Sequence, residues 1–316
     1  GSYCEIVNQD NRCVVRAKVV GFDDERLWLM PFGESLELSQ ECRVRAMTRP
    51  IGIPSMDVLK GSVLNAFAEP LHNIPWSNNT TLHTQAIHIN PVQRSRIDTP
   101  LSTGVRCIDA LLPMGRGQRM GIFAGSGVGK SMLLSMIAKR IDTDVLVMVL
   151  VGERGREVQE CIDDLHACDA MSNTIVIAAS ADESALMRTQ AVYTATSIAR
   201  HFAEHGQHVM LMVDSITRFA MAKRDIGLAL GEPPTARGYT PSVFSSLPPL
   251  IEQAGHFEHG SISAIYSVLV DGDDFNEPIA DMMRSLLDGH IVLSRALAHK
   301  GHFPAIDVLQ SISRLS

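Results

Sequence analysis

Aromatic side chains and long apolar runs are scarce in this 316-residue chain, and their scarcity excludes several classes of protein. No run approaches the roughly 20 consecutive apolar residues that a membrane-spanning helix needs, and we expect no secretory signal peptide. Phe, Trp and Tyr make up 5% of the residues, and the net charge is −7. This balance argues against a nucleic-acid-binding surface over the whole chain, so we expect no nucleic-acid partner.

Cysteines and clustered metal ligands are also scarce. The six cysteines form no C-x-x-C pair and stand among apolar or helical neighbours, which predicts reduced thiols in a cytosolic protein. The twelve histidines are scattered along the chain. His256 and His259 come closest to a metal site, but no third ligand is evident, and a plain loop is the simpler interpretation.

A glycine-rich loop at Phe123–Ser131, which reads Phe-Ala-Gly-Ser-Gly-Val-Gly-Lys-Ser, is the strongest functional signal in the sequence. It lies between an apolar strand at Arg119–Phe123 and an amphipathic helix that begins near Ser131. Glycines let backbone N–H groups close on phosphate oxygens, and the positive end of the helix dipole points at them. Lys130 would neutralise the β- and γ-phosphates, and the Ser131 hydroxyl would ligate Mg²⁺.

The loop therefore predicts a site for ATP with Mg²⁺, although Ala124 replaces the first glycine of the strict pattern. A glycine-rich turn beside a chance Gly-Lys-Ser would not explain why strand, loop and helix follow in the required order. The residues expected to contact the nucleotide are Gly125, Ser126, Gly127, Val128, Gly129, Lys130, Ser131 and Met132.

A carboxylate follows the apolar run Val209–Val213, which we expect to be a buried strand. Asp214, at the carboxyl end of that strand, can hold the water shell of Mg²⁺ beside Ser131. An apolar run followed by Asp is common, and the phosphate loop upstream is what favours this role.

A second acidic element, Val151–Val158, follows a predicted strand at Val145–Val151. Glu153 is our candidate for the base that orients and polarises the water attacking the γ-phosphate. Arg154 and its neighbour Arg156 would position Glu153 or contact phosphate. Glu157 would order a water on the metal, or would simply be favoured by the dipole at the start of the next helix.

Strands and helices alternate from about residue 98, which predicts a mainly parallel sheet covered on both faces. The expected strands are Arg119–Phe123, Val145–Val151, Thr174–Ala178, Val209–Val213, Ile262–Leu269 and His290–Leu293. We therefore expect an ATPase core over 98–316, preceded by a connecting segment over 51–97 that is rich in Pro, Asn and Ser. A stretch with five prolines, Gly231–Leu250, breaks the alternation and predicts either a functional loop or a rigid surface connection.

The first fifty residues have the turn-rich pattern of short antiparallel strands. The expected strands are Cys13–Val20, Arg26–Met30 and Cys42–Met47. They predict a small, partial β-barrel over residues 1–50.

Several motifs together resemble the type III protein-export ATPases of the bacterial flagellum and the injectisome, which are similar in turn to rotary ATP synthase subunits. They are Phe123–Ser131, Gly152–Glu157, Asp214–Phe219, Gly231–Pro234, Gly301–Asp307 and Ser311–Arg314. The resemblance covers nearly the whole chain and implies a RecA-like P-loop core behind an N-terminal barrel. The segment Pro54–Gly61 departs from the family pattern, and the helical C-terminal domain of the family is expected to be absent after Ser316.

The resemblance also implies an activity and partners. It implies a homohexameric ATPase in the cytoplasm, peripheral to the inner membrane, that couples hydrolysis to chaperone release and unfolding of export substrates, with stalk and regulator proteins as partners. Lys130, Glu153, Arg154 and Asp214 match the family's loop lysine, catalytic glutamate, adjoining arginine and metal-side aspartate. Phe303 falls where an aromatic ring stacks on adenine. Arg314 falls where the arginine finger of a neighbouring subunit lies.

Three alternatives remain open from the residues. A catalytic subunit of a rotary synthase usually has Thr where Gly155 stands, and hexamers of one chain type would argue against it. A non-hydrolysing, ring-building subunit would have Gln in place of Glu153. An RNA-driven hexameric motor is disfavoured by the acidic balance, and stimulation of hydrolysis by RNA would test it.

Overall fold

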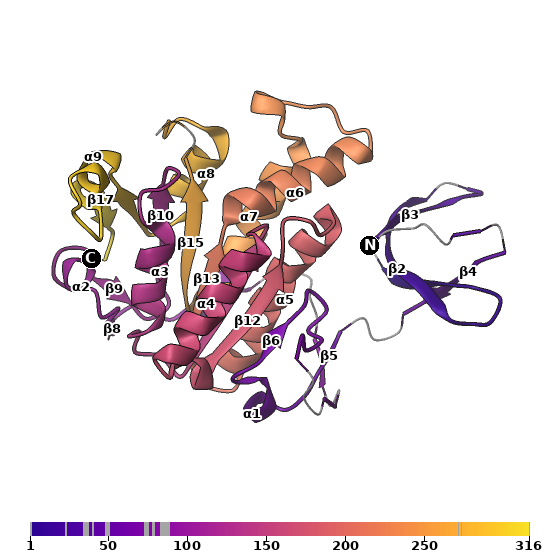
Figure 1. Cartoon of the computed structure of the whole chain (residues 1–316), viewed down its shortest axis with the longest axis horizontal. Coiled ribbons are helices and arrows are strands. Elements are labelled where there is room, and N and C mark those ends of the chain that lie inside the picture. The colour runs from indigo at the N-terminus through magenta and orange to yellow at the C-terminus, as the bar shows by residue number, and fades with distance from the viewer. Residues whose placement is uncertain are drawn as a thin grey trace.

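The computed structural model contains a small N-terminal sheet and a larger α/β core (Figure 1). It describes residues 2–22, 24–33, 38–39, 41–47, 51–72, 76–77, 80–82, 89–270, 272 and 274–315. Parts of the predicted barrel (1, 23, 34–37, 40 and 48–50) and of the predicted connecting segment (73–75, 78–79 and 83–88) lie outside the described residues.

The core is built on a sheet that has nine strands within the described residues, in the order β17-β16-β10-β15-β13-β11-β12-β6 with β14 paired to β15. These strands are β6 (Val63–Leu64), β10 (Arg119–Ala124), β11 (Val145–Val151), β12 (Thr174–Ala179), β13 (His208–Asp214), β14 (Gly255–His256), β15 (Ser261–Leu269), β16 (Gly289–Leu293) and β17 (Ile306–Ser313). Neighbouring strands are parallel except where β17 joins β16 and β14 joins β15. Each apolar run predicted to be a strand lies in this sheet, and the predicted α/β class is confirmed.

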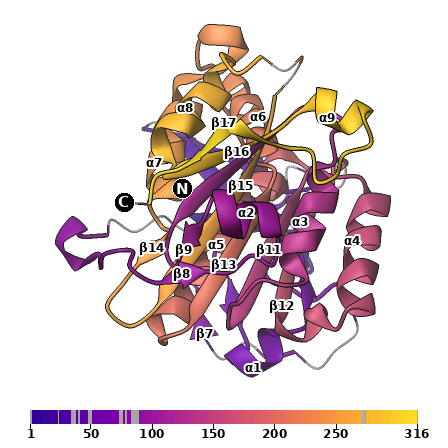
Figure 2. The same cartoon turned by 90° about the vertical axis from the view of Figure 1, so that its left-hand side faces the viewer.

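Helices cover both faces of the sheet, which explains why β11 is apolar at every position. Odd-numbered residues of β11, from Val145 to Val151, join the apolar layer of α5 to α8, and even-numbered residues, from Leu146 to Leu150, join the layer of α2 to α4. Figure 2 shows α3 and α4 together on one side of the sheet. The covering helices are α2 (Arg106–Leu111), α3 (Lys130–Ala138), α4 (Gly155–Ala167), α5 (Ala185–Glu204), α6 (Ile216–Ala229), α7 (Pro241–Ile251) and α8 (Pro278–Leu286).

The proline-rich stretch Gly231–Leu250 is not a loop over its whole length, and that prediction is wrong for its second half. The short helix η3 (Ala236–Gly238) is followed by α7, in which Pro241 occupies the first turn, where its missing N–H costs no hydrogen bond. Val243, Leu247, Leu250 and Ile251 recur at helical spacing and are buried. Burial of this apolar face outweighs the two backbone donors lost at Pro248 and Pro249.

The N-terminal sheet is antiparallel and runs in the order β3-β2-β1-β4. Its strands are β1 (Tyr3–Val7), β2 (Cys13–Phe22), β3 (Leu27–Pro31) and β4 (Arg43–Ala46), of which β1 was not predicted. Hydrogen bonds join this sheet to α5: the Tyr3 hydroxyl donates to Gln190 Oε1 at 2.6 Å, and Ser184 Oγ donates to the Phe32 carbonyl at 2.6 Å.

The segment after this sheet is partly built into the core, because β6 pairs with β12. The boundaries at residues 50 and 97 stay predictions. The remaining elements are β5 (Gly52–Ile53), α1 (Met56–Leu59), β7 (Thr80–Thr81), η1 (Pro91–Gln93), β8 (Pro100–Leu101), β9 (Met114–Gly115), η2 (Ala170–Asn173) and α9 (Arg295–His299). His256 lies in β14 rather than in the plain loop expected for it. Among the described helices, none is long and apolar enough to cross a membrane.

Candidate active site

The glycine-rich loop joins the end of β10 to the first residue of α3, as its sequence predicts. Gly127 and Gly129 have φ angles of +73° and +93°, a region that residues with a side chain rarely adopt. Gly129 caps α3 without a side-chain hydrogen bond, so the N–H groups of the first turn are directed at the space in front of the loop. A loop of this shape, at the positive end of a helix dipole, can bind phosphate.

Lys130, the first residue of α3, meets Glu153 and Asp214 at the carboxyl ends of β11 and β13. Lys130 Nζ lies 3.4 Å from Glu153 Oε1 and forms a close ion pair with Asp214 Oδ1. All three side chains are largely buried, with 11%, 10% and 8% of their surfaces exposed. Glu153 follows β11 and Asp214 ends β13, and these strands are neighbours in the sheet. The structure therefore brings together the lysine, the candidate base and the metal-side carboxylate that the sequence places far apart.

Ser267 is a member of this cluster that sequence reasoning missed. Its side chain is fully buried on β15, and its Oγ donates a hydrogen bond to Asp214 Oδ1 at 2.6 Å. β15 lies between β10, which leads into the phosphate loop, and β13, which carries Asp214. A serine inside an apolar strand is the only signal in the sequence, and it becomes informative once the strand order is known.

Arg218, in the first turn of α6, is the second missed residue. Its guanidinium donates to the Gly152 carbonyl and lies 3.3 Å from Glu153 Oε2. We expected Arg154 or Arg156 to position Glu153, but Arg154 is exposed at the start of α4 and Arg156 pairs with Glu160 along that helix. The arginine that holds the carboxylate in this structure is Arg218, while a phosphate contact by Arg154 stays a prediction.

The electrostatic environment suits Glu153 to proton transfer. Burial raises the pKa of Glu153 to about 7, a hydrogen bond with Glu157 adds to the rise, and Lys130 opposes it. The same hydrogen bond lowers the pKa of Glu157, so Glu157 is the charged partner near neutral pH. A carboxyl group with a pKa near 7 is matched to general-base chemistry at neutral pH.

A cavity of about 660 Å³ opens between α3 and α4 beside this cluster. Ser131, Met132, Glu157 and Asp214 are among the residues that line it. A hydroxyl and carboxylates are oxygen ligands of the kind that Mg²⁺ prefers, and Mg²⁺ commonly keeps several water or phosphate ligands. Among the described residues, no three His, Cys, Asp or Glu side chains gather closely enough to hold a metal by themselves. The lining therefore fits a Mg²⁺ ion shared with bound phosphates.

Two residues after β16 contact the phosphate loop. The ring of Phe303 lies against Gly129, where an added Cβ would meet its Cδ1 at 3.1 Å, and 44% of Phe303 is exposed. Arg295, which sequence reasoning missed, donates from Nη1 to the Ser126 carbonyl at 3.1 Å. Stacking of Phe303 on adenine stays a prediction, with which the partly exposed ring beside the phosphate loop is compatible.

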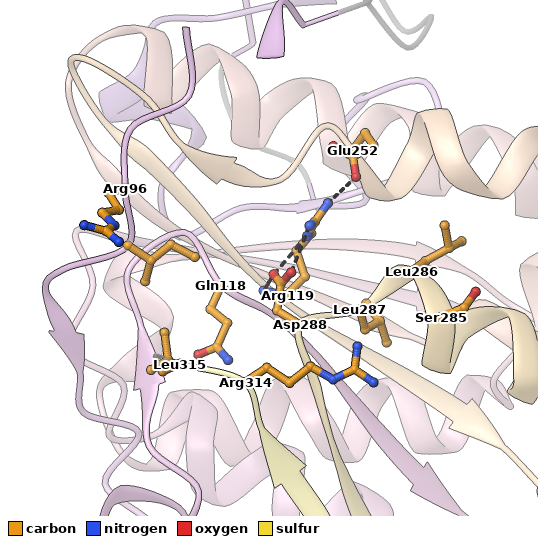
Figure 3. Close-up of a pocket in the computed structure, with 11 residues that line it drawn as sticks. Arg96, Gln118, Arg119, Glu252, Ser285, Leu286, Leu287, Asp288, Arg314 and Leu315 are labelled. Atoms are coloured by element: carbon orange, nitrogen blue, oxygen red, sulfur yellow. Dashed lines mark hydrogen bonds and ion pairs between the residues drawn. The ribbon is translucent and has the colours of Figure 1, made fainter. Parts of the chain in front are cut away.

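Arg314 is not brought to the phosphate loop of its own chain. It follows β17, whose last residue, Ser313, lies opposite Gly289, and Gly289 in turn lies opposite Met120 near the start of β10. The loop begins at the other end of β10, so roughly 17 Å of strand separates the two sites. Figure 3 shows Arg314 extended along a different cavity, of about 460 Å³, that Arg119 and Asp288 also line.

A phosphate loop that opens a helix, with a lysine, an aspartate and a glutamate gathered at the carboxyl ends of a parallel sheet, defines a P-loop nucleotide hydrolase with a RecA-like core. The model of the ATP synthase alpha/beta family, nucleotide-binding domain, matches residues 104–313. The chain belongs to this family.

Curated relatives agree with this assignment. The chain is 52% identical over 304 residues to the flagellum-specific ATP synthase of Bacillus subtilis. The alignment covers 96% of this chain and 69% of the relative. It is 47% identical over 316 residues to the type 3 secretion system ATPase of Xanthomonas euvesicatoria, with coverage of 100% and 72%.

Solved structures agree as well. The assembled ATPase EscN from the type III secretion system of enteropathogenic E. coli superposes with a TM-score of 0.91 at 42% identity, covering 99% of this chain and 76% of EscN. EscN in complex with its central stalk EscO gives a TM-score of 0.91 at 41% identity, with coverage of 100% and 76%. The family, the fold and the ATPase activity predicted from the motifs are confirmed.

Proposed function

We propose that this chain is the catalytic core of an ATPase that hydrolyses Mg-ATP to energise type III protein export. The meeting of Lys130, Glu153 and Asp214 beside the phosphate loop is the observation that carries the proposal. The relatives named above serve flagellar and type III secretion systems, and the acidic, aromatic-poor composition disfavours a motor driven by RNA. A non-hydrolysing subunit is disfavoured because Glu153 has the burial and contacts of a base.

Each group has a task in the reaction. The loop amides and Lys130 bind the β- and γ-phosphates, which frees Lys130 from the carboxylates it contacts in this structure. Ser131 would hold Mg²⁺, Asp214 would hold the water shell of the ion, and Glu157 would order a water on it. When bound, the ion neutralises charge that develops on the phosphate oxygens. Glu153, held by Arg218, accepts the proton of the attacking water.

Assembly would complete the site. Arg314 lies far from its own phosphate loop and is exposed, so we place it in the site of a neighbouring copy, where it stabilises the charge on the γ-phosphate. The full-length protein then works as a homohexamer in the cytoplasm, peripheral to the inner membrane. Its partners are a stalk, regulators, and the chaperones and substrates of export, which it releases and unfolds.

Replacement of Lys130 by alanine tests this function. The variant loses the cation that faces the β- and γ-phosphates, so ATP affinity should fall by about 10²-fold or more. Isothermal titration measures the affinity for ATP. The role in export is measured by the secretion of export substrates from a host bacterium in which the variant replaces the wild-type protein at equal abundance. Lys60→Ala is a matched control, because Lys60 follows α1 and donates to the Asp144 carbonyl at the amino end of β11, away from the phosphate loop. Unchanged ATP affinity or undiminished secretion in the Lys130 variant would refute the proposal.

A further inference from the structure

An ion pair at the amino end of the sheet joins the first residue of β10 to the residue before β16. Asp288 Oδ2 accepts hydrogen bonds from the Arg119 backbone N–H at 2.9 Å and from Arg119 Nε at 3.0 Å, and Oδ1 accepts from Nη2 at 2.9 Å. The Asp288 N–H donates to the Arg119 carbonyl at 2.9 Å. Only 17% of the arginine side chain and 27% of the aspartate side chain are exposed. Charge-assisted, bidentate pairs of this kind fix direction as well as distance.

The same aspartate holds the backbone of Arg314. The Arg314 N–H donates to the Asp288 carbonyl at 2.9 Å. Next to it the two strands are in close contact, because a Cβ on Gly289 would meet the Ile312 carbonyl oxygen at 2.5 Å. On the other side, Ser313 Oγ donates to the Pro113 carbonyl at 2.6 Å. The Arg314 backbone is therefore fixed, and the clamp between Arg119 and Asp288 is one hydrogen bond away from it.

The Arg314 side chain, in contrast, is free to serve another molecule. It is exposed, and among the residues that the structure describes no carboxylate lies within ion-pair distance of it. Figure 3 shows its guanidinium pointing away from the Arg119–Asp288 pair, along the cavity and toward the side of Leu287 and Ser285. Because its backbone is fixed, the Arg314 side chain can reach only the space that its rotamers cover from that point.

We propose that Arg119 is a positioning residue for Arg314: by clamping Asp288 it sets the direction in which the Arg314 guanidinium leaves the subunit. The inference rests on the proposed role of Arg314 in a neighbouring copy. It assigns Arg119 an effect on the neighbour's site and not on its own. The planar guanidinium of an arginine is needed, because it binds both carboxylate oxygens and so fixes the orientation of the carboxylate. A lysine in its place offers a point charge that cannot do this. Misplacement of a catalytic group by about 1 Å can cost up to about 10²-fold in rate.

Asp288→Asn in the full-length hexamer tests the clamp. The substitution keeps the size of the side chain but removes the charge that Arg119 holds. We expect the kcat for ATP hydrolysis to fall by roughly 10-fold, with ATP affinity and hexamer content unchanged. Arg119→Lys should give the same fall in kcat, and it replaces Asp288→Asn as the test if the aspartate variant is too unstable. Glu252→Gln is the matched control, because it removes the other carboxylate that Arg119 contacts, at 2.5 Å, and leaves Asp288 in place.

Mixed hexamers then separate an effect on the neighbour from an effect on the variant's own site. Glu153→Gln subunits lack the base but carry an intact Arg314, so equal mixing with Asp288→Asn subunits should restore about a quarter of the wild-type rate, the share of adjacent pairs in the productive order. Mixing Asp288→Asn with Arg314→Ala should restore nothing. The rate of the Asp288→Asn and Glu153→Gln mixture could equal the sum of the rates of its two variants while the mixture of Arg314→Ala with Glu153→Gln regains activity. In that case the clamp acts within its own subunit and the inference is wrong. If Arg314→Ala plus Glu153→Gln also stays inactive, the in-trans role of Arg314 fails, and the clamp proposal fails with it.

Discussion

Glu153 shows how the surroundings of a single residue change its chemistry. An exposed glutamate would be fully ionised and weakly basic at neutral pH. Here burial raises the pKa of Glu153 to about 7, and Arg218 fixes one of its oxygens at 3.3 Å. The side chain is thereby both oriented and basic enough to accept a proton from water.

The raised pKa of Glu153 predicts the pH dependence of hydrolysis. The base must be deprotonated to act, so kcat/KM should rise as the pH increases from 6 to 8, with a midpoint near 7. Steady-state rates at constant ionic strength measure the profile. Glu153→Gln should lower the rate by about 10²-fold or more while ATP stays bound, and its residual rate should lose the midpoint. A midpoint that survives in this variant would assign the titration to another group.

Phe303 gives the second prediction at this scale. Base stacking on an aromatic ring contributes about 1–3 kcal/mol, so Phe303→Ala should raise the KM for ATP roughly tenfold and change kcat little. Phe303→Tyr keeps the ring and should behave like the wild type. An unchanged KM with a lowered melting temperature would show that the ring serves only to pack against Gly129.

At the scale of elements, the order of the strands decides which side chains meet. β15 lies between the strand of the phosphate loop and the strand of Asp214, and Ser267 uses this place to donate to the Asp214 carboxylate. A hydrogen bond to a charged group is worth about 1.5–3 kcal/mol. Ser267 thus orients the Asp214 carboxylate from the neighbouring strand.

Ser267→Ala should weaken the binding of Mg²⁺ more than that of ATP. We expect the Mg²⁺ concentration for half-maximal rate to rise roughly tenfold, because Asp214 loses the bond that orients it. Titration of the rate with Mg²⁺ at saturating ATP measures this shift, and Ser267→Thr, which keeps the hydroxyl, is the control. A lower rate with an unshifted Mg²⁺ dependence would contradict the role.

The sequence predicts elements best where burial imposes one pattern. Val145–Val151 is apolar at every position because helices cover both faces of the sheet, and the run needs no tertiary knowledge to identify. The helix α7 was missed because three prolines interrupt its apolar spacing, and β1 because four of its five residues are apolar and do not alternate with polar ones.

The residues of the candidate site also divide into those that the sequence predicts and those that it does not. The phosphate loop, Glu153 and Asp214 were readable because their chemistry is local to a strand end. Ser267, Arg218 and the Arg119–Asp288 clamp depend on which strands and helices become neighbours, and residue spacing does not encode that.

At the scale of the whole molecule, β10 connects the phosphate loop to Arg314, the residue that we propose completes the site of a neighbouring copy. Its carboxyl end leads into the phosphate loop, and its amino end lies beside Arg314. Because roughly 17 Å of strand separates them, no side-chain rotation brings Arg314 to its own γ-phosphate. Turnover should therefore depend on a ring in which each copy supplies a cation to the next.

This dependence is the last prediction. The specific rate of hydrolysis by the full-length wild type should rise with protein concentration through the range in which hexamers form, and the residues 1–316 alone, if monomeric, should bind ATP yet hydrolyse it slowly. Arg314→Ala should cut kcat by roughly 10³-fold at every concentration with little loss of affinity, because the spreading charge on the γ-phosphate oxygens loses its cation. Sedimentation together with rate measurements tests both statements, and Arg284→Ala, on α8, controls for the loss of a nearby positive charge. A monomer that turns over at the rate of the hexamer would place the completing cation within a single chain.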